Sequence, residues 1–508
     1  MLARMLRIGT VLALLTALTW SLAQTLIVAR GTDALTLDVH RATDSPTATV
    51  LAHIFESLFD LTNEGEIVPR LATGYEVSAD ELEWTFFIRE GVTFTDGTPL
   101  TAEIVRGSME RLWNPDNAFA YRFLIAQVTE MEAVDDYTFV MRLDEPFAPL
   151  LFHMTHTFTS IMNPAAIEAA GEAVVEQPVG TGPFMLGSWD RNTSLEIVRN
   201  DDYWGDNATV EAVRFLVVPE GTSRMALIEA GEAHIAERVP PQDMARIDAH
   251  PEITVTIEPS VRTAYVYFNQ FQEPFGNVLV RRAINHAVNK DEIVEFVLGG
   301  LGRVSDAPIS PEIFGYSPIG TYAYDPELAR QLLAEAGFPD GFSTTLYAPT
   351  GRYLQDIQVA EAIQSQLAEV GINAEIETTS DFSAYIAITN EPPETNEVTM
   401  GYLAWGTVTG DADYGLYGIL HSSQWRPLGN NRSFYRNVIV DDLLDEARST
   451  SDLATREALY ADAMRLIFED AAWLFLHQES QVLAVRDNVE GLVIHFTERV
   501  IADNVTIR

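Results

Sequence analysis

Several short segments contain residue types that enzymes use, but none has a complete catalytic spacing. Residues 180–183 (GTGP) begin like a dinucleotide fingerprint, yet they lack the third glycine, and Pro183 has no N–H for a phosphate. Residues 315–319 (GYSPI) miss the nucleophile elbow because Ile319 stands where glycine is required. The chain has no HExxH motif, no Walker sequence and no cysteine. The sequence therefore predicts no catalytic residue and no enzymatic activity.

Two histidines are spaced so that they could bind a metal together. His153 and His156 have the i, i+3 spacing that places two rings on one face of a helix, where they could share an ion. No carboxylate accompanies them, and such a pair more often packs in a core or contacts a ligand. We therefore expect no metal site and no cofactor.

The chain is strongly acidic, with 74 Asp and Glu against 32 Lys and Arg and a net charge of -42. Nucleic acid is excluded as a partner, because phosphate binding needs clustered basic side chains. The carboxylates are scattered along the chain, which is typical of a solvated surface. Paired carboxylates could serve a secreted hydrolase, but with this many acidic residues pairs arise by chance, so that function stays a remote alternative.

The N-terminus has the pattern of a secretory signal peptide. Arg4 and Arg7 precede an apolar run over residues 8–20, and a small-residue cleavage site follows at Ser21-Leu22-Ala23. The run is shorter than the roughly 20 residues of a membrane-spanning helix. Without a cysteine, a lipid cannot be attached through an N-terminal Cys. We expect cleavage after residue 23 and a mature protein in the periplasm without lipid or membrane anchor.

Strand and helix patterns alternate along the rest of the chain, which predicts an α/β fold. Residues 84–89 alternate as a strand, and the turn at Asp96-Gly97 predicts a hairpin. Further strands are expected at residues 195–198, 213–218, 253–257 and 264–268. Asp325 and Pro326 begin a helix that Gly337 ends, and residues 451–468 form a second amphipathic helix.

Two stretches look like connections between larger units. They are residues 263–276, where an aromatic strand ends in a Pro-Phe-Gly turn, and residues 478–488. Two crossings between the same pair of lobes would form a hinge, because a domain entered and left through strands can rotate about them.

Four long segments together resemble the peptide, opine and nickel class of extracellular solute-binding proteins of ABC transporters, family 5. They are residues 67–72 with 84–103 (IVPRLA and WTFFIREGVTFTDGTPLTAE), 178–184 (PVGTGPF) with 199–204, 280–290 (VRRAINHAVNK), and 324–341 (YDPELARQLLAEAGFPDG). These segments occur in the family's order across nearly the whole mature chain.

The resemblance implies a two-lobed periplasmic-binding-protein fold of the large dipeptide- and oligopeptide-binding type, with mixed sheets flanked by helices and a ligand cleft between the lobes. Lobe I is expected over residues 24–263, with an inserted subdomain at about 42–183, and is completed by residues 487–508. Lobe II is expected over residues 264–486. The implied partners are a small peptide-like ligand, an ABC permease and, through it, the ATPase subunits, and we expect a monomer.

The resemblance also names candidate ligand-binding residues. The segment from Trp405 to residue 416 (WGTVTGDADYGL) and residues 431–435 (NRSFY) are most similar to glutathione-binding members and their opine- and peptide-binding relatives. Peptide binders of the family place an aspartate shortly after such a tryptophan to pair with the ligand's α-amine. Counting from Trp405 places Val408 there instead, which leaves Asp411 or Asp413 as substitutes and favours glutathione or a modified peptide over a plain dipeptide.

The remaining candidates are positively charged or aromatic. Arg122 falls where some relatives hold a ligand carboxylate, a role that suits the two parallel donors of guanidinium. Arg352 and Tyr353 follow a turn that faces the cleft in relatives, and Trp405 and Tyr414 are expected at the cleft wall. An alternative within the same family is a nickel- or metal-chelate-binding component, with His40, His53, His153 and His156 as the residues that could reach the cleft.

Overall fold

The computed structural model describes residues 24–171 and 177–508, so the expected signal peptide over residues 1–23 lies outside the described residues. The predicted α/β fold is confirmed. In the described chain a large mixed sheet of 11 strands runs through the molecule, in the order β15-β14-β16-β12-β17-β11-β1-β10-β9-β8, with β13 paired beside β17. The strands are β1 (Thr25–Arg30), β8 (Phe184–Asp190), β9 (Ser194–Arg199), β10 (Ala212–Val217), β11 (Ile235–Glu237), β12 (Ile253–Phe268), β13 (Gly302–Val304), β14 (Phe342–Pro349), β15 (Ile372–Thr379), β16 (Met400–Gly406) and β17 (Trp473–Arg486).

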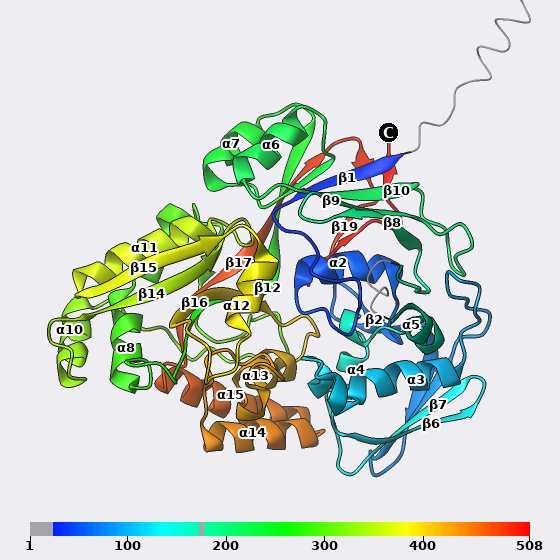
Figure 1. The fold of residues 1–508 in the computed structure, drawn as a ribbon, viewed down its shortest axis with the longest axis horizontal. Coiled ribbons are helices and arrows are strands. Elements are labelled where there is room, and N and C mark those ends of the chain that lie inside the picture. The colour runs from blue at the N-terminus through cyan, green and yellow to red at the C-terminus, as the bar shows by residue number, and fades with distance from the viewer. Residues whose placement is uncertain (1–23, 172–176) are drawn as a thin grey trace, which may run out of the picture.

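Two long antiparallel strands, β12 and β17, connect the two halves of the molecule (Figure 1). At one end, the second half of β17 pairs with the first half of β12 and with β11, and β11 pairs with β1. At the other end, the second half of β12 pairs with the first half of β17 and with β16. The pairing shifts register between Pro259 and Thr263, opposite Ser480 and Gln478. We therefore define lobe I as residues 24–262 and 479–508, and lobe II as residues 263–478.

The expected borders at residues 263 and 486 both lie on these two strands, and the division into lobes stays a prediction. The strands expected at residues 253–257 and 264–268 form one continuous strand, β12, and not two. The second crossing lies earlier than residue 486, because Leu483 to Val485 already pair with β11 in lobe I. Because each of these two strands pairs with partners in both lobes, the lobe border lies within the strand, where the register shifts.

The chain leaves the large sheet after β1 and returns at β8, and the intervening segment covers one side of lobe I (Figure 1). Its sheets are β2-β3 and β4-β5-β7-β6. Its elements are α2 (Ser45–Ile54), β2 (Phe59–Leu61), β3 (Ile67–Pro69), β4 (Ala72–Val77), β5 (Glu83–Ile88), α3 (Ala102–Trp113), β6 (Val128–Asp135), β7 (Thr138–Leu143), α4 (Leu150–His153) and α5 (Pro164–Ala170). Helices α6 (Gly221–Glu229) and α7 (Pro241–Asp248) follow later in lobe I.

The predicted strand at residues 84–89 is present as β5, but its partners differ from the predicted hairpin. It pairs with β4 and β7, not with the residues after the Asp96-Gly97 turn. The reason is the aromatic face of the strand: Trp84 stacks on Tyr75 at 5.7 Å, and Phe86 stacks on Phe139 at 6.1 Å between ring centroids. Burying these rings between neighbouring strands stabilises the sheet more than a local turn does.

The helices of lobe II flank its part of the sheet, and α13 and α14 lie beside lobe I (Figure 1). Asp325 caps α10 by accepting a hydrogen bond from the Leu328 N–H, as the sequence predicts. The helices are α8 (Val278–Ala287), α9 (Lys290–Glu292), α10 (Pro326–Glu335), α11 (Asp356–Glu369), α12 (Phe382–Thr389), α13 (Ala412–Leu420), α14 (Val438–Ser449) and α15 (Leu453–Glu469). The helix expected at residues 451–468 is α15.

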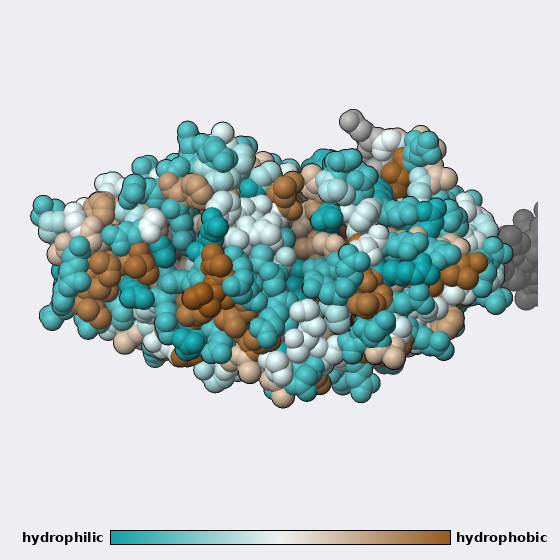
Figure 2. All heavy atoms as spheres, turned by 90° about the horizontal axis from the view of Figure 1, so that it is seen from below, coloured by the Kyte–Doolittle hydropathy of each residue, from teal (hydrophilic) through white to brown (hydrophobic). Residues whose placement is uncertain are grey.

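The C-terminal segment returns to lobe I in two short ladders, β18 (Val489–Glu490) with β21 (Thr506–Ile507) and β19 (Val493–Ile494) with β20 (Val500–Ile501). The face shown in Figure 2 is mostly hydrophilic, with apolar side chains in separate patches. Within the described part of the chain, none of the helices combines the length and apolar content needed to cross a membrane.

Candidate functional site

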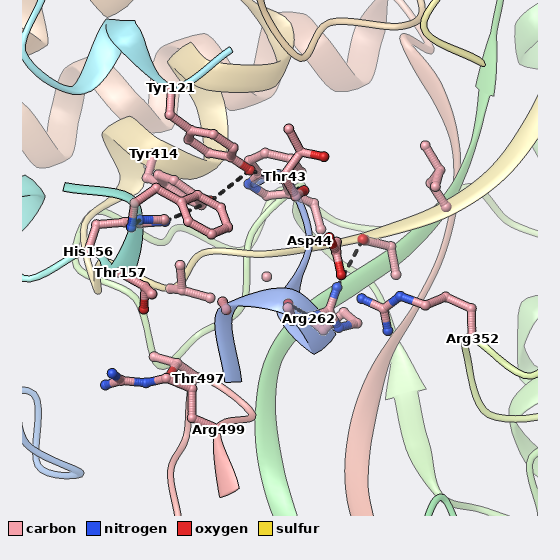
Figure 3. Close-up of a pocket in the computed structure, with 18 of the residues that line it drawn as sticks. Thr43, Asp44, Tyr121, His156, Thr157, Arg262, Arg352, Tyr414, Thr497 and Arg499 are labelled. Atoms are coloured by element: carbon pink, nitrogen blue, oxygen red, sulfur yellow. Dashed lines mark hydrogen bonds between the residues drawn. The ribbon is translucent and has the colours of Figure 1, made fainter. Parts of the chain in front are cut away.

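A pocket lies between the two lobes, with about 840 Å³ of atom-free space including its opening to solvent. Lobe I contributes the segment before α2, the 3-10 turns around Tyr121 and Thr157, and the C-terminal ladder; lobe II contributes the loop before α11, strand β16 and helix α13 (Figure 3). The lining residues are Thr43, Asp44, Ser45, Ala48, Leu61, Tyr121, Thr155, His156, Thr157, Phe158, Arg262, Tyr265, Arg352, Tyr353, Phe382, Ile386, Leu403, Ala404, Trp405, Gly406, Val408, Tyr414, Arg432, Thr497 and Arg499.

One wall of the pocket is aromatic and joins the lobes. Trp405 and Tyr414 of lobe II lie 5.2 Å apart between ring centroids, and Tyr121 of lobe I stacks on Tyr414 at 6.0 Å. The Trp405 Nε1–H has no hydrogen-bond partner within the described residues. Flat rings bind ligand surface with little loss of rotamer freedom, so this wall can cover the apolar part of a solute.

A chain of hydrogen bonds runs along this wall from one lobe to the other (Figure 3). The Phe158 N–H donates to His156 Nδ1 at 2.9 Å, so the His156 proton is on Nε2, which lies 3.1 Å from the Tyr414 hydroxyl. Tyr414 in turn donates to the Tyr121 hydroxyl at 3.3 Å. Burial holds the pKa of His156 well below 6.5, in agreement with a neutral ring. These bonds cross the lobe boundary and order the wall.

Arg352 is presented by a tight turn between β14 and α11. Gly351 has φ +79, and a Cβ there would lie 2.6 Å from the Pro219 carbonyl oxygen, so only glycine fits. The N–H groups of Arg352 and Tyr353 both donate to Asp356 Oδ2, at 2.8 and 3.1 Å. The guanidinium lies 4.7 Å from the Tyr353 ring centroid and 5.3 Å from that of Phe382. The turn and the two rings thus hold the side chain in one place.

The Arg352 side chain is 2% exposed, and its Nε and Nη1 have no hydrogen-bond partner among the residues that the structure describes. Burial lowers its pKa from 12.5, although a guanidinium stays protonated. A buried guanidinium with free donors is a strong site for a carboxylate, because two parallel hydrogen bonds can form.

Asp44 is the carboxylate of the pocket, at the start of α2. Its Oδ1 accepts from the Thr47 N–H at 3.0 Å and caps the helix, while Oδ2 has no partner within residues 24–171 and 177–508. Burial raises the pKa of Asp44, and its hydrogen bonds from Thr47 oppose that shift. A cationic group of a ligand would lower the free energy of the ionised form.

The other charged lining residues differ in how they are compensated. Arg262 Nε donates to Glu498 at 2.7 Å, and Arg499 Nη2 donates to Asp60 at 3.4 Å. Arg432 donates only to the Asn390 side chain, at 2.9 Å, and its Nε is unpartnered in the described chain. Although the chain as a whole is strongly acidic, the uncompensated charge of the pocket is therefore positive. The arrangement suits a solute that carries carboxylates and an ammonium group.

Four of the predicted ligand-binding residues lie together in this pocket: Arg352, Tyr353, Trp405 and Tyr414. The other three, Arg122, Asp411 and Asp413, do not line it. The Arg122 Nε donates to the Trp113 carbonyl at 2.6 Å, at the end of α3. Its positive charge there interacts favourably with the C-terminal end of α3, so the Arg122 side chain stabilises lobe I and does not face the pocket.

Asp411 and Asp413 are fully buried at the start of α13, behind the aromatic wall. Asp411 caps the helix through the Asp413 N–H and accepts from Arg456 Nη2 at 2.9 Å. The Asp413 carboxylate lies 2.9 Å from Arg448 Nε and 3.2 Å from His153 Nε2. Burial acts to raise the pKa of Asp413, but the charge of Arg448, together with His153 and Arg456, outweighs it and the pKa is lowered. Both carboxylates already have partners, so they are structural.

The histidines do not form a metal site in the described residues, where no group of three or more His, Asp or Glu side chains has a suitable arrangement. His153 and His156 are not ligands of a common site: His153 contacts Asp413, and His156 contacts Tyr414. His40 contacts the Arg111 side chain, and His53 Nδ1 contacts the Thr49 carbonyl.

Sequence reasoning missed Asp44, Arg262, Tyr121 and Arg432 as lining residues. Two of them had a local signal. Asp44 precedes Ser45-Pro46, a helix-start pattern, and Arg262 is a charged residue in the second half of β12, which is buried from Ser260 onwards. Arg432 belongs to residues 431–435, noted above as similar to the family, and Tyr121 directly precedes the candidate Arg122, but nothing local distinguishes either residue from its neighbours.

The chain matches a family of known proteins over most of its length. The family model described as bacterial extracellular solute-binding proteins, family 5 Middle, matches residues 66–427. A relative from Escherichia coli O1:K1 / APEC, named glutathione-binding protein GsiB, is 32% identical over 473 residues, which are 93% of this chain and 92% of that protein.

Solved structures are similar over nearly the whole chain. The periplasmic binding protein DppA from Helicobacter pylori, in complex with the peptide STSA, has a TM-score of 0.87 and 28% identity and covers 94% of this chain and 98% of its own. The binding protein AgaA from A. tumefaciens R10, in complex with agropinic acid, has a TM-score of 0.87 and 27% identity and covers 95% and 99%. This chain belongs to the bacterial extracellular solute-binding proteins of family 5.

Proposed function

We propose that this protein is the solute-binding component of an ABC importer and captures a short peptide-like solute, such as glutathione, in the periplasm. It acts as a monomer that delivers the solute to a membrane permease and, through it, to ATPase subunits. The similar proteins named above bind glutathione, a peptide and an opine derivative, all of which carry carboxylates. These likenesses support a ligand of that class.

One observation carries the proposal: the pocket between the lobes contains opposite buried charges with unused hydrogen-bonding atoms. Arg352 has free donors and Asp44 has a free acceptor within the described chain, and the aromatic wall of Trp405 and Tyr414 lies in the same pocket. A zwitterionic peptide supplies the carboxylate for Arg352 and the ammonium for Asp44. Buried charges without partners destabilise a protein, and a ligand that pairs with them recovers that free energy.

Ligand contact with both lobes explains how capture is signalled. A solute that touches Arg352 of lobe II and Asp44 of lobe I stabilises the closed arrangement by its differential affinity. We propose that the protein releases the solute chemically unchanged, since the sequence contains no catalytic motif. Export with removal of residues 1–23, and the absence of lipid, are parts of the same proposal.

A thermal-shift screen followed by calorimetry tests the function. The mature protein, from residue 24, is unfolded, washed free of bound solute and refolded, then mixed with glutathione, di- to pentapeptides, opines, and nickel with histidine. A ligand that binds only the folded state raises the melting temperature. We expect glutathione or a short peptide to do so, and mass spectrometry to recover it intact.

The exposed Arg465, which pairs with Asp462 on the surface of α15, supplies a matched control for the pocket arginines. Arg465→Gln should bind the solute as tightly as the parent does, whereas Arg352→Gln should bind it more weakly. Binding of nickel with histidine alone, or multiple-turnover cleavage of the peptide, would contradict the proposal.

A further inference from the structure

Two arginines next to the pocket, Arg426 and Arg432, are buried without a carboxylate partner. They are 4% and 6% exposed, and neither forms an ion pair within the described residues. Three other buried arginines differ from this pair: Arg448 and Arg456 contact Asp413 and Asp411, and Arg224 donates to a set of backbone carbonyls. The two arginines therefore form an unusual concentration of buried positive charge.

The loop over residues 425–435 holds this pair together. Trp425 and Asn431 form an isolated bridge, and the Arg426 N–H donates to the Asn431 carbonyl at 3.3 Å. Arg426 Nη2 donates to Asn430 Oδ1 at 2.7 Å, and Arg432 Nη2 donates to Asn390 Oδ1 at 2.9 Å. Both partners are neutral amides, so hydrogen bonds orient the guanidinium groups but leave their charge uncompensated.

Each of the two side chains also keeps a free donor. The Nε atoms of Arg426 and Arg432 are buried and have no hydrogen-bond partner in the part of the chain that the structure describes. Burial, together with the charge of Arg432, holds the pKa of Arg426 well below 12.5. Arg432 lines the pocket directly, and Arg426 lies beside it in the loop. An anion that hydrogen-bonds to these two guanidinium groups would compensate their charge and so bind favourably.

We propose that Arg432, supported by Arg426, is a second anion subsite, which binds a second carboxylate of the captured solute. This inference rests on the proposed function and narrows its ligand. Asp44 takes one ammonium group, Arg352 takes one carboxylate and Arg432 takes another. The solute class is then a peptide-like molecule with two carboxylates and one ammonium, and not a peptide with a single carboxylate.

The charge of the pocket supports this class. With Arg262 and Arg499 each paired to a carboxylate, the uncompensated lining charges are those of Asp44, Arg352 and Arg432. A solute with one positive and two negative groups would match all three. A simple dipeptide would leave Arg432 buried without a partner, and an unpaired buried charge lowers affinity.

Three probes that differ by one carboxylate test the subsite by calorimetry. The probes are glutathione, its glycine amide, and the analogue in which 4-aminobutyryl replaces the γ-glutamyl group and so lacks the α-carboxylate. Each is titrated into the parent, Arg432→Gln, Arg352→Gln and the surface control Arg465→Gln. We expect Arg432→Gln to weaken the binding of glutathione at least 30-fold, and to weaken the binding of one of the two analogues less than threefold, because that analogue lacks the carboxylate that Arg432 binds. Arg352→Gln should leave the binding of the other analogue nearly unchanged.

The outcomes separate the subsite from the function. If the parent binds all three probes equally, or if Arg432→Gln weakens all three equally, the second subsite is wrong and the proposed function stands. If the parent binds none of the three, the proposed function fails for this ligand class and the subsite fails with it.

A stability measurement distinguishes ligand contact from a structural role. Removing an uncompensated buried charge should leave the ligand-free melting temperature of Arg432→Gln unchanged or higher, whereas a structural arginine would lower it. Arg432→Lys keeps the charge and should recover part of the affinity for glutathione. A melting temperature that rises with chloride in the parent but not in Arg432→Gln, without any difference among the probes, would mean an adventitious ion only and would overturn the proposal.

Discussion

Two regions of this protein bury charged side chains, and they differ in how those charges are paired. At the start of α13, Asp411 and Asp413 contact Arg456, Arg448 and His153, so each carboxylate has a basic partner. In the pocket, neither Asp44 nor Arg352 has an oppositely charged side chain within ion-pair distance among the described residues, and Asp44 Oδ2 and two Arg352 nitrogens have no hydrogen-bond partner there. The comparison teaches that a buried charge indicates a ligand site only where the protein itself has not supplied its partner.

The direction of the side chains on α13 explains why neighbouring residues take different roles. Asp413 and Tyr414 are consecutive, and consecutive positions on a helix point about 100° apart. Asp413 contacts His153 and Arg448 on one side, whereas Tyr414 faces the pocket on the other. The helix therefore joins the paired cluster to the aromatic wall.

The largest expected effect is on stability, from breaking the paired cluster. Asp413→Ala leaves Arg448 buried without its carboxylate, so the free energy of unfolding should fall by about 3 to 5 kcal/mol. Denaturant unfolding of the ligand-free protein measures this loss. Asp44→Asn, which also removes a buried carboxylate but one without a basic partner, is the matched control. If Asp413→Ala were as stable as the parent, the ion pairs at the start of α13 would not stabilise the fold, and the contrast between the paired cluster and the pocket would be wrong.

The cluster should also make stability depend on pH in a defined direction. The pKa of Asp413 is lowered in the folded protein, so its contribution is fully present above its unfolded pKa, about 3.9. The contribution is lost as the pH falls through the folded pKa. We expect the stability difference between the parent and Asp413→Asn to shrink as the pH is lowered from 6 towards 3. A difference that grows over this range would contradict the assignment.

The next largest effect is expected on binding, from Arg352. Arg352→Gln removes the free guanidinium donors, and the affinity for glutathione or the best peptide of the screen should fall by about 2 to 5 kcal/mol. The ligand-free stability should stay near that of the parent, because the lost charge has no partner in the described chain. Calorimetry and unfolding on the same sample check both parts. A large loss of stability with unchanged affinity would mean that Arg352 is a structural residue, like the arginines paired with Asp411 and Asp413.

A smaller effect is expected from Asp44→Asn. Asparagine caps a helix about as well as aspartate, so α2 should stay intact while the charge for an ammonium group is removed. We expect a loss of about tenfold in affinity. Since burial raises the pKa of Asp44, the parent should also lose affinity when the pH falls through that raised value, and Asp44→Asn should not. Titrations between pH 7 and 4 test this, and parallel pH profiles would contradict it.

The smallest effect is expected from Arg122. The side-chain hydrogen bond that Arg122 donates to the Trp113 carbonyl should contribute about 0.5 to 1.5 kcal/mol to stability and nothing to binding. Arg122→Gln should therefore bind the solute as the parent does. A tenfold loss of affinity would return Arg122 to the ligand site and show that the pocket extends beyond the residues described above.

The sequence by itself determined the family, the α/β fold and part of the pocket. Strand alternation and helix caps are local properties, so β5 and α10 were predictable at their residues. The glycine turn before Arg352 and the aromatic segment at Trp405 were found for the same reason: their conformation or chemistry is set by adjacent residues.

Only the tertiary structure decided which charges are free. Asp411 and Asp413 follow Trp405 closely and look like ligand residues, but their partners come from α4, α14 and α15, which the fold brings to α13. The wall joins His156 and Tyr414, which are 258 positions apart. Whether a charge is compensated depends on such distant neighbours and on burial, because Coulomb energy and desolvation follow distance in space and not position in sequence.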